Sequence, residues 1–382
     1  MNIQLLNKIA AVGLKELGDG YNVGETVENP DGIMVRSAAM HEMEFGSELK
    51  AIARAGAGVN NIPIERCSEQ GIVVFNTPGA NANGVKELAV CALLLAARDV
   101  VGGIDWAKTL TEDVAKQVEK GKSKFAGTEL MGKTLGVIGL GAIGGLIANT
   151  AIHLGMNVIG CDPFLSVEGA WNLNHRVNRA ATYDEIFEKA DYITLHVPAT
   201  KDTKNMICTV NIAKMKPGVK IINLARADLV NAADLKTALA DGKISAYVTD
   251  FPTEEVLNVP GVVAIPHLGA STAESEDNCA IMAARELDDY LVNGNIKNSV
   301  NFPNVDMPRT GAARICVLHA NVPAVLTKVT AALAEEGLNI ENMTNKSKGE
   351  NAYTVLDVSS TPSDAAVARI AGVEGVMRVR II

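Results

Sequence analysis

The chain has 382 residues, of which 48% are hydrophobic and 21% charged, and its formal net charge is −9 at pH 7. This length suggests two or three domains, and the composition is that of a globular chain with a sizeable core, which excludes a disordered protein. The acidic balance argues against nucleic acid and against a membrane surface as partners, so an anionic substrate would have to be bound by locally gathered arginines.

The cysteines are scattered along the chain: Cys67, Cys91, Cys161, Cys208, Cys279 and Cys316. They form no C-x-x-C pair and have no histidine at metal-ligand spacing, so we expect reduced thiols, a cytoplasmic protein and no metal site. The sequence also shows no charged leader followed by an apolar run and no apolar run of about 18 residues, so we expect neither export nor a membrane span.

Over residues 1–96, short apolar strands alternate with helical stretches, which predicts a small parallel sheet. The ends of three strands carry small or polar residues: Arg36 and Ser37, then Arg54 with Gly56 and Gly58, then Asn76-Thr77-Pro78 with Asn81. Ligands of open α/β sheets bind beyond the carboxyl ends of strands. Two arginines beside glycine-rich loops indicate an anionic ligand, although each could also be a solvated strand-end charge.

Residues 84–99 are predicted to form a long helix whose apolar face, from Leu88 through Ala96, is buried between domains. The following segment, residues 101–133, has charges throughout and a group of lysines: Lys116, Lys120, Lys122 and Lys124. We interpret this segment as a solvated arm. The alternative is an oligomer arm that brings a lysine to the substrate of a neighbouring subunit.

An apolar strand that starts at Leu135 breaks into glycines and continues as a helix from Ala142. Gly139, Gly141 and Gly144 fill the G-x-G-x-x-G fingerprint, in which the glycines allow a tight turn, close approach of a pyrophosphate and close packing of helix on strand. A second strand ends at Asp162, about 20 residues further on, where a carboxylate reaches the ribose hydroxyls of a dinucleotide. Because an acid there repels a 2′-phosphate, NAD is favoured over NADP.

Residues 133–272 repeat strand and helix in doubly wound fashion, and polar residues follow the strands. These are His196-Val197-Pro198, Asn223 to Arg226, Thr249-Asp250 with Glu254 beyond, and Pro266-His267. Their strand ends are expected to converge on one edge. There His267 would exchange the proton of a hydroxyl, Glu254 would hold the imidazole, and Arg226 would bind a carboxylate through two hydrogen bonds. Taken singly, each could be an ordinary turn or loop residue.

A helix over residues 274–293 is predicted to return the chain to the first domain, and residues 302–309 read as a linker because two prolines interrupt regular structure. Residues 310–382 follow as a separate βαββαβ unit of ferredoxin-like plan. In it, Pro323 opens a helix that Gly337 caps.

Four ordered motifs together resemble the D-isomer-specific 2-hydroxyacid dehydrogenases: the glycine fingerprint, Asn223 to Arg226, Phe251 to Glu254, and Pro266 to Thr272. The resemblance implies an α/β protein in which a doubly wound Rossmann-type NAD domain (97–272) is inserted in a smaller flavodoxin-like substrate domain (1–96 and 273–301). It implies catalysis by His267 as acid and base, with Glu254 as its partner and Arg226 on the substrate carboxylate.

The same resemblance implies which residues contact the small molecules. NAD would contact Gly139, Gly141, Ala142, Ile143, Gly144, Asp162, Val197, Pro198, Leu224, Ala225, Asp250, Leu268, Gly269 and Ala270. Substrate would contact Arg36, Ser37, Arg54, Gly56, Gly58 and Asn81. Two positions depart from the family pattern: Ala227 replaces a glycine, and Thr249 replaces the aspartate directed at the nicotinamide carboxamide. Whether Thr249 or Asp250 makes that contact stays open.

Within the family, the chain is most similar to members that oxidise 3-phosphoglycerate to 3-phosphohydroxypyruvate, the entry to serine biosynthesis. The paired arginines Arg36 and Arg54 favour a phosphorylated substrate, since a plain hydroxyacid needs no second anion site. The alternatives are another D-2-hydroxyacid as substrate, or a non-enzymatic NAD-sensing regulator on the same fold.

The C-terminal unit resembles an ACT regulatory domain, which implies that His319, Asn321 and Asn339 bind an amino-acid effector, serine in this pathway. We also expect a homodimer or homotetramer. A purely structural or dimerising role is the alternative, because Ala324 stands where a glycine is usual and its methyl group would narrow the pocket.

Overall fold

The computed structural model describes residues 1–382 and divides into two compact units. Unit 1 comprises Met1–Asn81 and Glu276–Ile382, and unit 2 comprises Ala82–Ser275. These limits differ from the predicted domain boundaries at 96/97 and 272/273, chiefly because the helix after residue 81 packs within unit 2. None of the helices is both long and apolar enough to cross a membrane.

Unit 1 contains a five-stranded parallel sheet of order β2-β1-β3-β4-β5, the flavodoxin-like order. Its strands are β1 (Asn2–Leu6), β2 (Asn22–Gly24), β3 (Gly32–Val35), β4 (Ala51–Arg54) and β5 (Val73–Phe75). Its helices are α1 (Ala11–Leu14), α2 (Ile64–Glu69) and α11 (Ala273–Asn293), of which residues 273–275 belong to unit 2. The predicted helix over 274–293 is therefore confirmed to within one residue.

The C-terminal part of unit 1 has the predicted βαββαβ element order and forms an antiparallel sheet of order β14-β15-β13-β16. Its elements are β13 (Ala313–Ala320), α12 (Val325–Ala334), β14 (Ile340–Lys348), β15 (Asn351–Val358), α13 (Asp364–Ala371) and β16 (Val376–Ile381). The prediction that Pro323 opens the helix is wrong, because α12 begins at Val325 behind Ala324, which has a left-handed backbone (φ 68°). Gly337 (φ 70°) closes the helix as predicted.

Unit 2 contains a seven-stranded parallel sheet of order β12-β11-β10-β9-β6-β7-β8. Its strands are β6 (Thr134–Ile138), β7 (Asn157–Cys161), β8 (Val177–Arg179), β9 (Tyr192–Leu195), β10 (Val219–Asn223), β11 (Ile244–Thr249) and β12 (Val262–Ala264). The order reverses between β6 and β9, and ligands of doubly wound sheets bind at such a switch point. Hydrophobic residues fill both faces of the sheet, which is why its strands read as continuous apolar runs.

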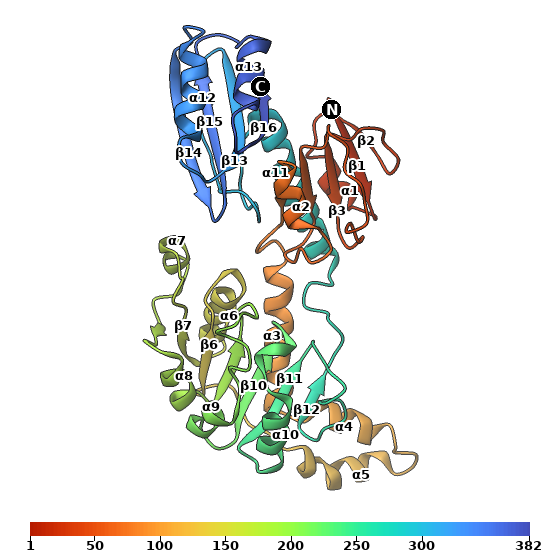
Figure 1. Cartoon of the computed structure of the whole chain (residues 1–382). Coiled ribbons are helices and arrows are strands. Elements are labelled where there is room, and N and C mark those ends of the chain that lie inside the picture. The colour runs from red at the N-terminus through yellow and green to blue at the C-terminus, as the bar shows by residue number, and fades with distance from the viewer. The chain divides into compact units, whose positions relative to one another are not determined.

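The helices of unit 2 cover this sheet and extend beyond it (Figure 1). They are α3 (Ala82–Ala97), α4 (Val100–Ala107), α5 (Val114–Gly121), α6 (Ala142–His153), α7 (Val167–Trp171), α8 (Tyr183–Lys189), α9 (Thr209–Lys214) and α10 (Ala232–Ala240), with 3₁₀ turns at Lys122–Phe125 and Ala227–Leu229. The predicted solvated arm contains α4, α5 and the first 3₁₀ turn, and the Trp106 ring packs 5.4 Å from that of Phe125. Its four lysines are exposed.

The segment predicted as a linker is irregular in backbone but not loosely solvated. Phe302, Val305 and Met307 are buried in the core of unit 1, and Val305 forms an isolated bridge with Ile296. The two prolines prevent regular secondary structure, but the segment is still held in the core, because burial of each large apolar side chain contributes roughly 1.5–3 kcal/mol.

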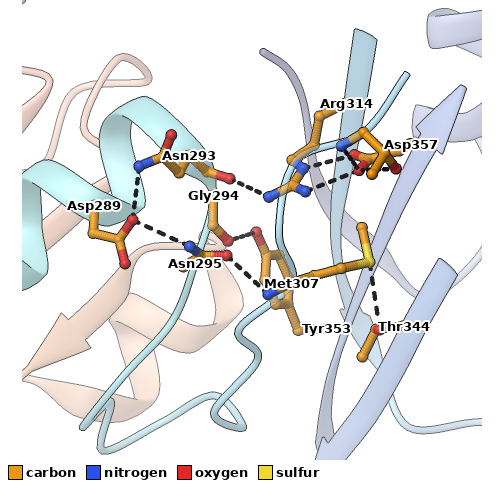
Figure 2. Close-up of polar contacts among 10 residues, drawn as sticks. Asp289, Asn293, Gly294, Asn295, Met307, Arg314, Thr344, Tyr353 and Asp357 are labelled. Atoms are coloured by element: carbon orange, nitrogen blue, oxygen red, sulfur yellow. Dashed lines mark hydrogen bonds and ion pairs between the residues drawn. The ribbon is translucent and has the colours of Figure 1, made fainter. Parts of the chain in front are cut away.

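The C-terminal sheet also caps α11, as Figure 2 shows for part of the contact. The Arg380 guanidinium donates to the carbonyls of Tyr290 (3.2 Å) and Leu291 (2.8 Å). The Arg314 guanidinium donates to the carbonyl of Asn293 (2.8 Å), and the Tyr353 hydroxyl donates to that of Gly294 (2.6 Å). The last carbonyls of a helix lack intrahelical partners and carry partial negative charge, so guanidinium groups there stabilise the helix. The Arg314 guanidinium in turn makes two hydrogen bonds to Asp357, and both side chains are fully buried.

Candidate active site

The glycine fingerprint lies between β6 and α6, where the structure explains each glycine separately. Gly139 has φ 88°, and a Cβ on it would clash with the carbonyl of His196. A Cβ on Gly144 would clash with the carbonyl of Gly139 at the close approach of helix to strand. A Cβ on Gly141 meets nothing within 4 Å, so this side of the turn is open to a ligand. The helix begins at the next residue and directs unpaired N–H groups there.

Asp162 stands at the end of β7 and lines a cavity of about 900 Å³ together with Leu140 and Gly160. One carboxylate oxygen accepts from the backbone N–H of Leu140 (2.9 Å) and the other from that of Phe164 (2.9 Å). The carboxylate is thus fixed beside the fingerprint turn. A cavity of this size next to an open glycine turn and a fixed carboxylate fits the adenosine half of a dinucleotide.

The remaining predicted cofactor residues occupy the same carboxyl edge, because β6, β9, β10 and β11 are parallel neighbours. Ala142 and Ile143 begin α6, Val197 and Pro198 follow β9, Leu224 and Ala225 follow β10, and Leu268, Gly269 and Ala270 follow His267.

The side chains of Arg226 and His267 both lie against the ring of Phe251. The Arg226 guanidinium is 5.3 Å from the centroid of the Phe251 ring, and the His267 ring is 4.3 Å from that centroid at an interplanar angle of 44°. This stack joins three loops that follow three different strands. The sequence reasoning named Phe251 only as part of a turn, and a spacing of 16 residues to the histidine carries no periodic signal.

Buried Asn223 shapes the turn that carries Arg226. Its amide donates to the Arg226 carbonyl (2.8 Å) and the Tyr247 hydroxyl (3.1 Å), and its oxygen accepts from the N–H groups of Ala225 (3.2 Å) and Arg226 (3.4 Å). An asparagine that binds the backbone of its own turn in this way fixes the turn's geometry. Arg226 itself is exposed, and its Nη1 donates to the Ala225 carbonyl (2.6 Å).

The two histidines at the strand ends differ in the availability of their ring nitrogens. His196 Nε2 lies 2.7 Å from the Thr194 hydroxyl, and desolvation lowers the pKa of His196 to about 3, so this ring is neutral at pH 7. The His267 ring is exposed and makes no hydrogen bond. Of the two, His267 is therefore the one free to exchange a proton with a substrate.

Asp250 is a buried carboxylate close to this stack. One of its oxygens accepts from the Gly269 N–H (3.2 Å), and the other has no partner. Burial raises the pKa of Asp250. The hydrogen bond from the Gly269 N–H and the positive charges of His267 and Arg226 lower it, but by less. The neighbouring Thr249 hydroxyl accepts from the Phe251 N–H (3.0 Å). Of Thr249 and Asp250, therefore, Asp250 is the residue with a side-chain oxygen that has no partner.

Glu254 is exposed and makes no hydrogen bond to His267, so the expected contact between these two side chains is absent from the structure. Glu254 lies on the turn that begins the short loop leading to His267. In the same turn, the Thr253 hydroxyl and the Val256 side chain are buried. The positive charge of His267 lowers the pKa of the Asp250 carboxyl, so these two side chains interact electrostatically.

In unit 1, the predicted substrate residues follow β3 and β4. Arg54 donates through Nε to the Arg36 carbonyl (3.0 Å), and its terminal nitrogens make no hydrogen bond. Burial and the charge of Arg36 lower the pKa of Arg54. Arg36 pairs with Glu276 (2.6 Å), a contact 240 residues apart in sequence that sequence reasoning missed. Two like charges with free donors indicate an anion site.

The other substrate residues line the same strand ends. The Ser37 N–H donates to the side chain of Asn7 (3.0 Å), which sequence reasoning also missed. Gly56 has φ 149° and Gly58 lies in the same loop, while Asn81 is the last residue of this part of unit 1.

The predicted effector residues do not converge within one chain. His319 is buried on β13, and its ring nitrogens contact the Ala320 carbonyl (2.8 Å) and the Thr354 hydroxyl (2.9 Å). Asn321 follows the same strand and donates to the Gly349 carbonyl (3.1 Å). Asn339 lies at the other end of the sheet, where it pairs with Ser359.

The chain is similar to known proteins of one family. Residues 92–269 match the family model described as D-isomer specific 2-hydroxyacid dehydrogenase, NAD binding domain. The chain is 30% identical over 386 residues to D-3-phosphoglycerate dehydrogenase of Haemophilus influenzae, covering 96% of this chain and 90% of that protein. It is 35% identical over 317 residues to the D-3-phosphoglycerate dehydrogenase of Synechocystis, covering 80% of this chain and 55% of that relative, so it spans little more than half of the longer protein.

Among solved structures, an NAD⁺-bound 3-phosphoglycerate dehydrogenase of Entamoeba histolytica is similar, with a TM-score of 0.61 and 30% identity. The similarity covers 79% of this chain and 98% of that one. The chain thus carries the family's NAD-binding domain in its Rossmann-type sheet. It belongs to the family of D-isomer-specific 2-hydroxyacid dehydrogenases.

Proposed function

We propose that this chain oxidises D-3-phosphoglycerate to 3-phosphohydroxypyruvate with NAD, the first step of L-serine biosynthesis. The observation that carries the proposal is the stack of Arg226, Phe251 and His267 at the carboxyl edge of the NAD-binding sheet. The relatives named above bear the name of this activity. The free guanidinium donors of Arg54 beside Arg36 favour a second anionic group on the substrate.

In this proposal, His267 accepts the proton of the substrate's C2 hydroxyl, and Arg226 binds the adjacent carboxylate. NAD, held by the fingerprint turn, Asp162 and the other predicted cofactor residues, supplies the acceptor for the hydride that leaves C2. Phe251 restricts the orientations of both side chains, because the His267 ring and the Arg226 guanidinium both lie close to its ring. Asp250 stabilises the imidazolium electrostatically and offers its free oxygen to the carboxamide, and Glu254 would hold His267 after a movement of its loop.

The reaction is tested by following NADH formation from NAD with 3-phosphoglycerate, glycerate and lactate as competing substrates. We expect turnover with the phosphorylated acid and loss of at least about a hundredfold in kcat in His267→Ala. Arg54→Ala should raise KM for 3-phosphoglycerate about tenfold or more, whereas Lys8→Ala, which removes an exposed positive charge of the same unit, should not. Turnover with lactate alone would indicate another D-2-hydroxyacid, and NAD binding without any turnover would indicate a sensor.

We also propose that the C-terminal βαββαβ sheet is an ACT domain that binds serine in a cytoplasmic homodimer or homotetramer, and that the NAD domain is inserted in the substrate domain. The strand order of the C-terminal sheet supports the ACT domain, and the six unpaired cysteines support a cytoplasmic protein. Because His319 and Asn339 lie at opposite ends of one sheet, a site that uses both needs two chains. Serine titration of NADH formation, together with sedimentation of the chain, tests this arrangement; inhibition by serine in a monomer would contradict it.

A further inference from the structure

A cavity of about 600 Å³ lies in unit 1 between one face of α11 and the loop that follows this helix. Ile281, Met282, Glu286 and Asp289 contribute from the helix, and Lys297 and Asn298 from the loop. None of these residues belongs to the proposed substrate, cofactor or effector sites. The volume lies in the range of pockets that bind small molecules, about 300–1,000 Å³.

Glu286 contributes to this cavity a buried carboxylate with one oxygen that has no partner. It is 7% exposed, one carboxylate oxygen accepts from the Asn298 amide (2.6 Å), and the other is buried without any hydrogen bond. Burial raises the pKa of Glu286 to about 7, although the hydrogen bond from the Asn298 amide and the charge of Lys297 both act to lower it. An unsatisfied buried oxygen of this kind is costly, and a hydrogen-bond donor placed in the cavity would remove the cost.

Of the other charged groups of the cavity, some already make hydrogen bonds or ion pairs and one does not. One oxygen of Asp289 accepts from the amides of Asn293 and Asn295, as Figure 2 shows. Arg285 is paired with Glu16 at 2.8 Å. Lys297 is exposed and makes neither a hydrogen bond nor an ion pair. The cavity therefore offers one buried carboxylate oxygen without a partner, that of Glu286, and one free ammonium group, that of Lys297. Ile281 and Met282 form an apolar wall beside them.

We propose that this cavity binds a zwitterionic amino acid, whose ammonium group donates to Glu286 and whose carboxylate accepts from Lys297. A short or apolar side chain would lie against Ile281 and Met282. The ligand would also lie beside Asn295, whose side-chain oxygen accepts from the Met307 N–H (3.2 Å) in the segment that leads to the C-terminal sheet. The proposal does not depend on the proposed enzymatic function.

The test is calorimetric titration of the full-length protein with L-alanine, and with methylammonium and acetate as ligands that carry only one of the two charges. We expect millimolar binding of L-alanine at one site per chain and much weaker binding of the other two. Glu286→Gln keeps the shape and the Asn298 contact but should weaken binding about tenfold or more, as should Lys297→Met, which changes an exposed side chain and leaves the fold intact. Asn321→Ala, at the predicted effector position, should bind as the parent does.

Proton linkage provides an independent readout. Burial raises the pKa of Glu286 to about 7, so its protonated and ionised forms are both present near neutral pH. Lys297, Arg285 and Asp289 are the charged groups around it. Since the ammonium favours the ionised carboxylate, binding near neutral pH should release protons, and the heat of binding should then depend on the buffer's ionisation enthalpy. Absence of L-alanine binding, equal binding of methylammonium, or loss of binding in Asn321→Ala but not in Glu286→Gln would overturn the proposal.

Discussion

Gly56 leaves the space that the guanidinium group of Arg54 occupies. A Cβ at this position would clash with that guanidinium, and the backbone of Gly56 (φ 149°) is one that side chains disfavour. We therefore expect Gly56→Ala to displace Arg54 and to raise KM for 3-phosphoglycerate about tenfold or more, as Arg54→Ala does. Steady-state kinetics measure the effect.

Gly46→Ala is the matched control for this variant, because a Cβ on Gly46 meets nothing within 4 Å and its backbone needs no glycine. This control should keep the KM of the parent. An unchanged KM in Gly56→Ala would show that Arg54 does not bind the phosphorylated group in the position that the structure gives it.

Single residues were predictable from the sequence where their role is local. Gly144 is required by its close approach to Gly139, Gly141 by an open turn, and Gly139 by its own left-handed backbone as well as by the carbonyl of His196. The spacing of the three glycines expresses the local part of these needs. The stack of Arg226, Phe251 and His267 depends instead on three separate loops meeting in space. The free oxygen of Asp250 likewise depends on the fold around it, so no spacing in the sequence could have indicated it.

At the scale of single elements, α12 begins with a strained residue. Ala324 has φ 68°, a left-handed backbone that costs an alanine roughly 1 kcal/mol more than a glycine. Ala324→Gly should therefore stabilise the protein by about 0.5–1 kcal/mol, which denaturant unfolding can measure. Ala331→Gly, at an exposed position inside the same helix, should destabilise it by a similar amount. Destabilisation by both would contradict the strain at Ala324.

The cap on the end of α11 rests on a buried ion pair. Hydrogen bonds from Arg314 and from Thr310 lower the pKa of Asp357, overcoming the effect of burial. Asp357→Asn leaves the Arg314 charge buried without compensation and should cost about 3–5 kcal/mol of unfolding free energy. Tyr353→Phe removes one hydrogen bond to Gly294 and should cost about 1–2 kcal/mol.

The control for these two variants is Asp105→Asn, which breaks an exposed pair with Lys108 (3.0 Å) and should change the unfolding free energy little. Urea unfolding at neutral pH compares all three. If Asp357→Asn were as harmless as Asp105→Asn, the pair would not hold the C-terminal sheet to α11.

Elements were predicted well where hydrophobic periodicity is strong, as in the strands of unit 2 and in α11. The segment over residues 302–309 was not, because its prolines and polar residues indicate a linker while Phe302, Val305 and Met307 are buried. They belong to a buried cluster that also contains residues of α11, β5 and β15. Sequence patterns record the periodicity within a segment and not the surface against which it packs, so the burial of an irregular segment escapes them.

At the scale of the whole molecule, unit 1 has a core that its two sheets share. Tyr290 of α11 contacts Phe75 of β5 (ring centroids 5.7 Å apart), and the Arg380 guanidinium of β16 lies 4.5 Å from the Tyr290 ring centroid. The same cluster of buried residues includes Ile3 of β1 and Tyr353 of β15. The C-terminal sheet therefore belongs to the core of unit 1 and is not a tethered appendage.

Native-state hydrogen exchange tests this shared core through Tyr290→Ala, which removes a fully buried ring and should cost about 3–5 kcal/mol. Because the ring connects both sheets, amides of β4 and β5 and amides of β13 and β15 should lose protection together and by similar free energies. Leu94→Ala, at a half-exposed position of α3 in unit 2, should leave both sets unchanged. If β4 and β5 lost protection while β13 and β15 kept theirs, the C-terminal sheet would be an independently stable domain, and the buried cluster around Tyr290 would not act as one cooperative unit.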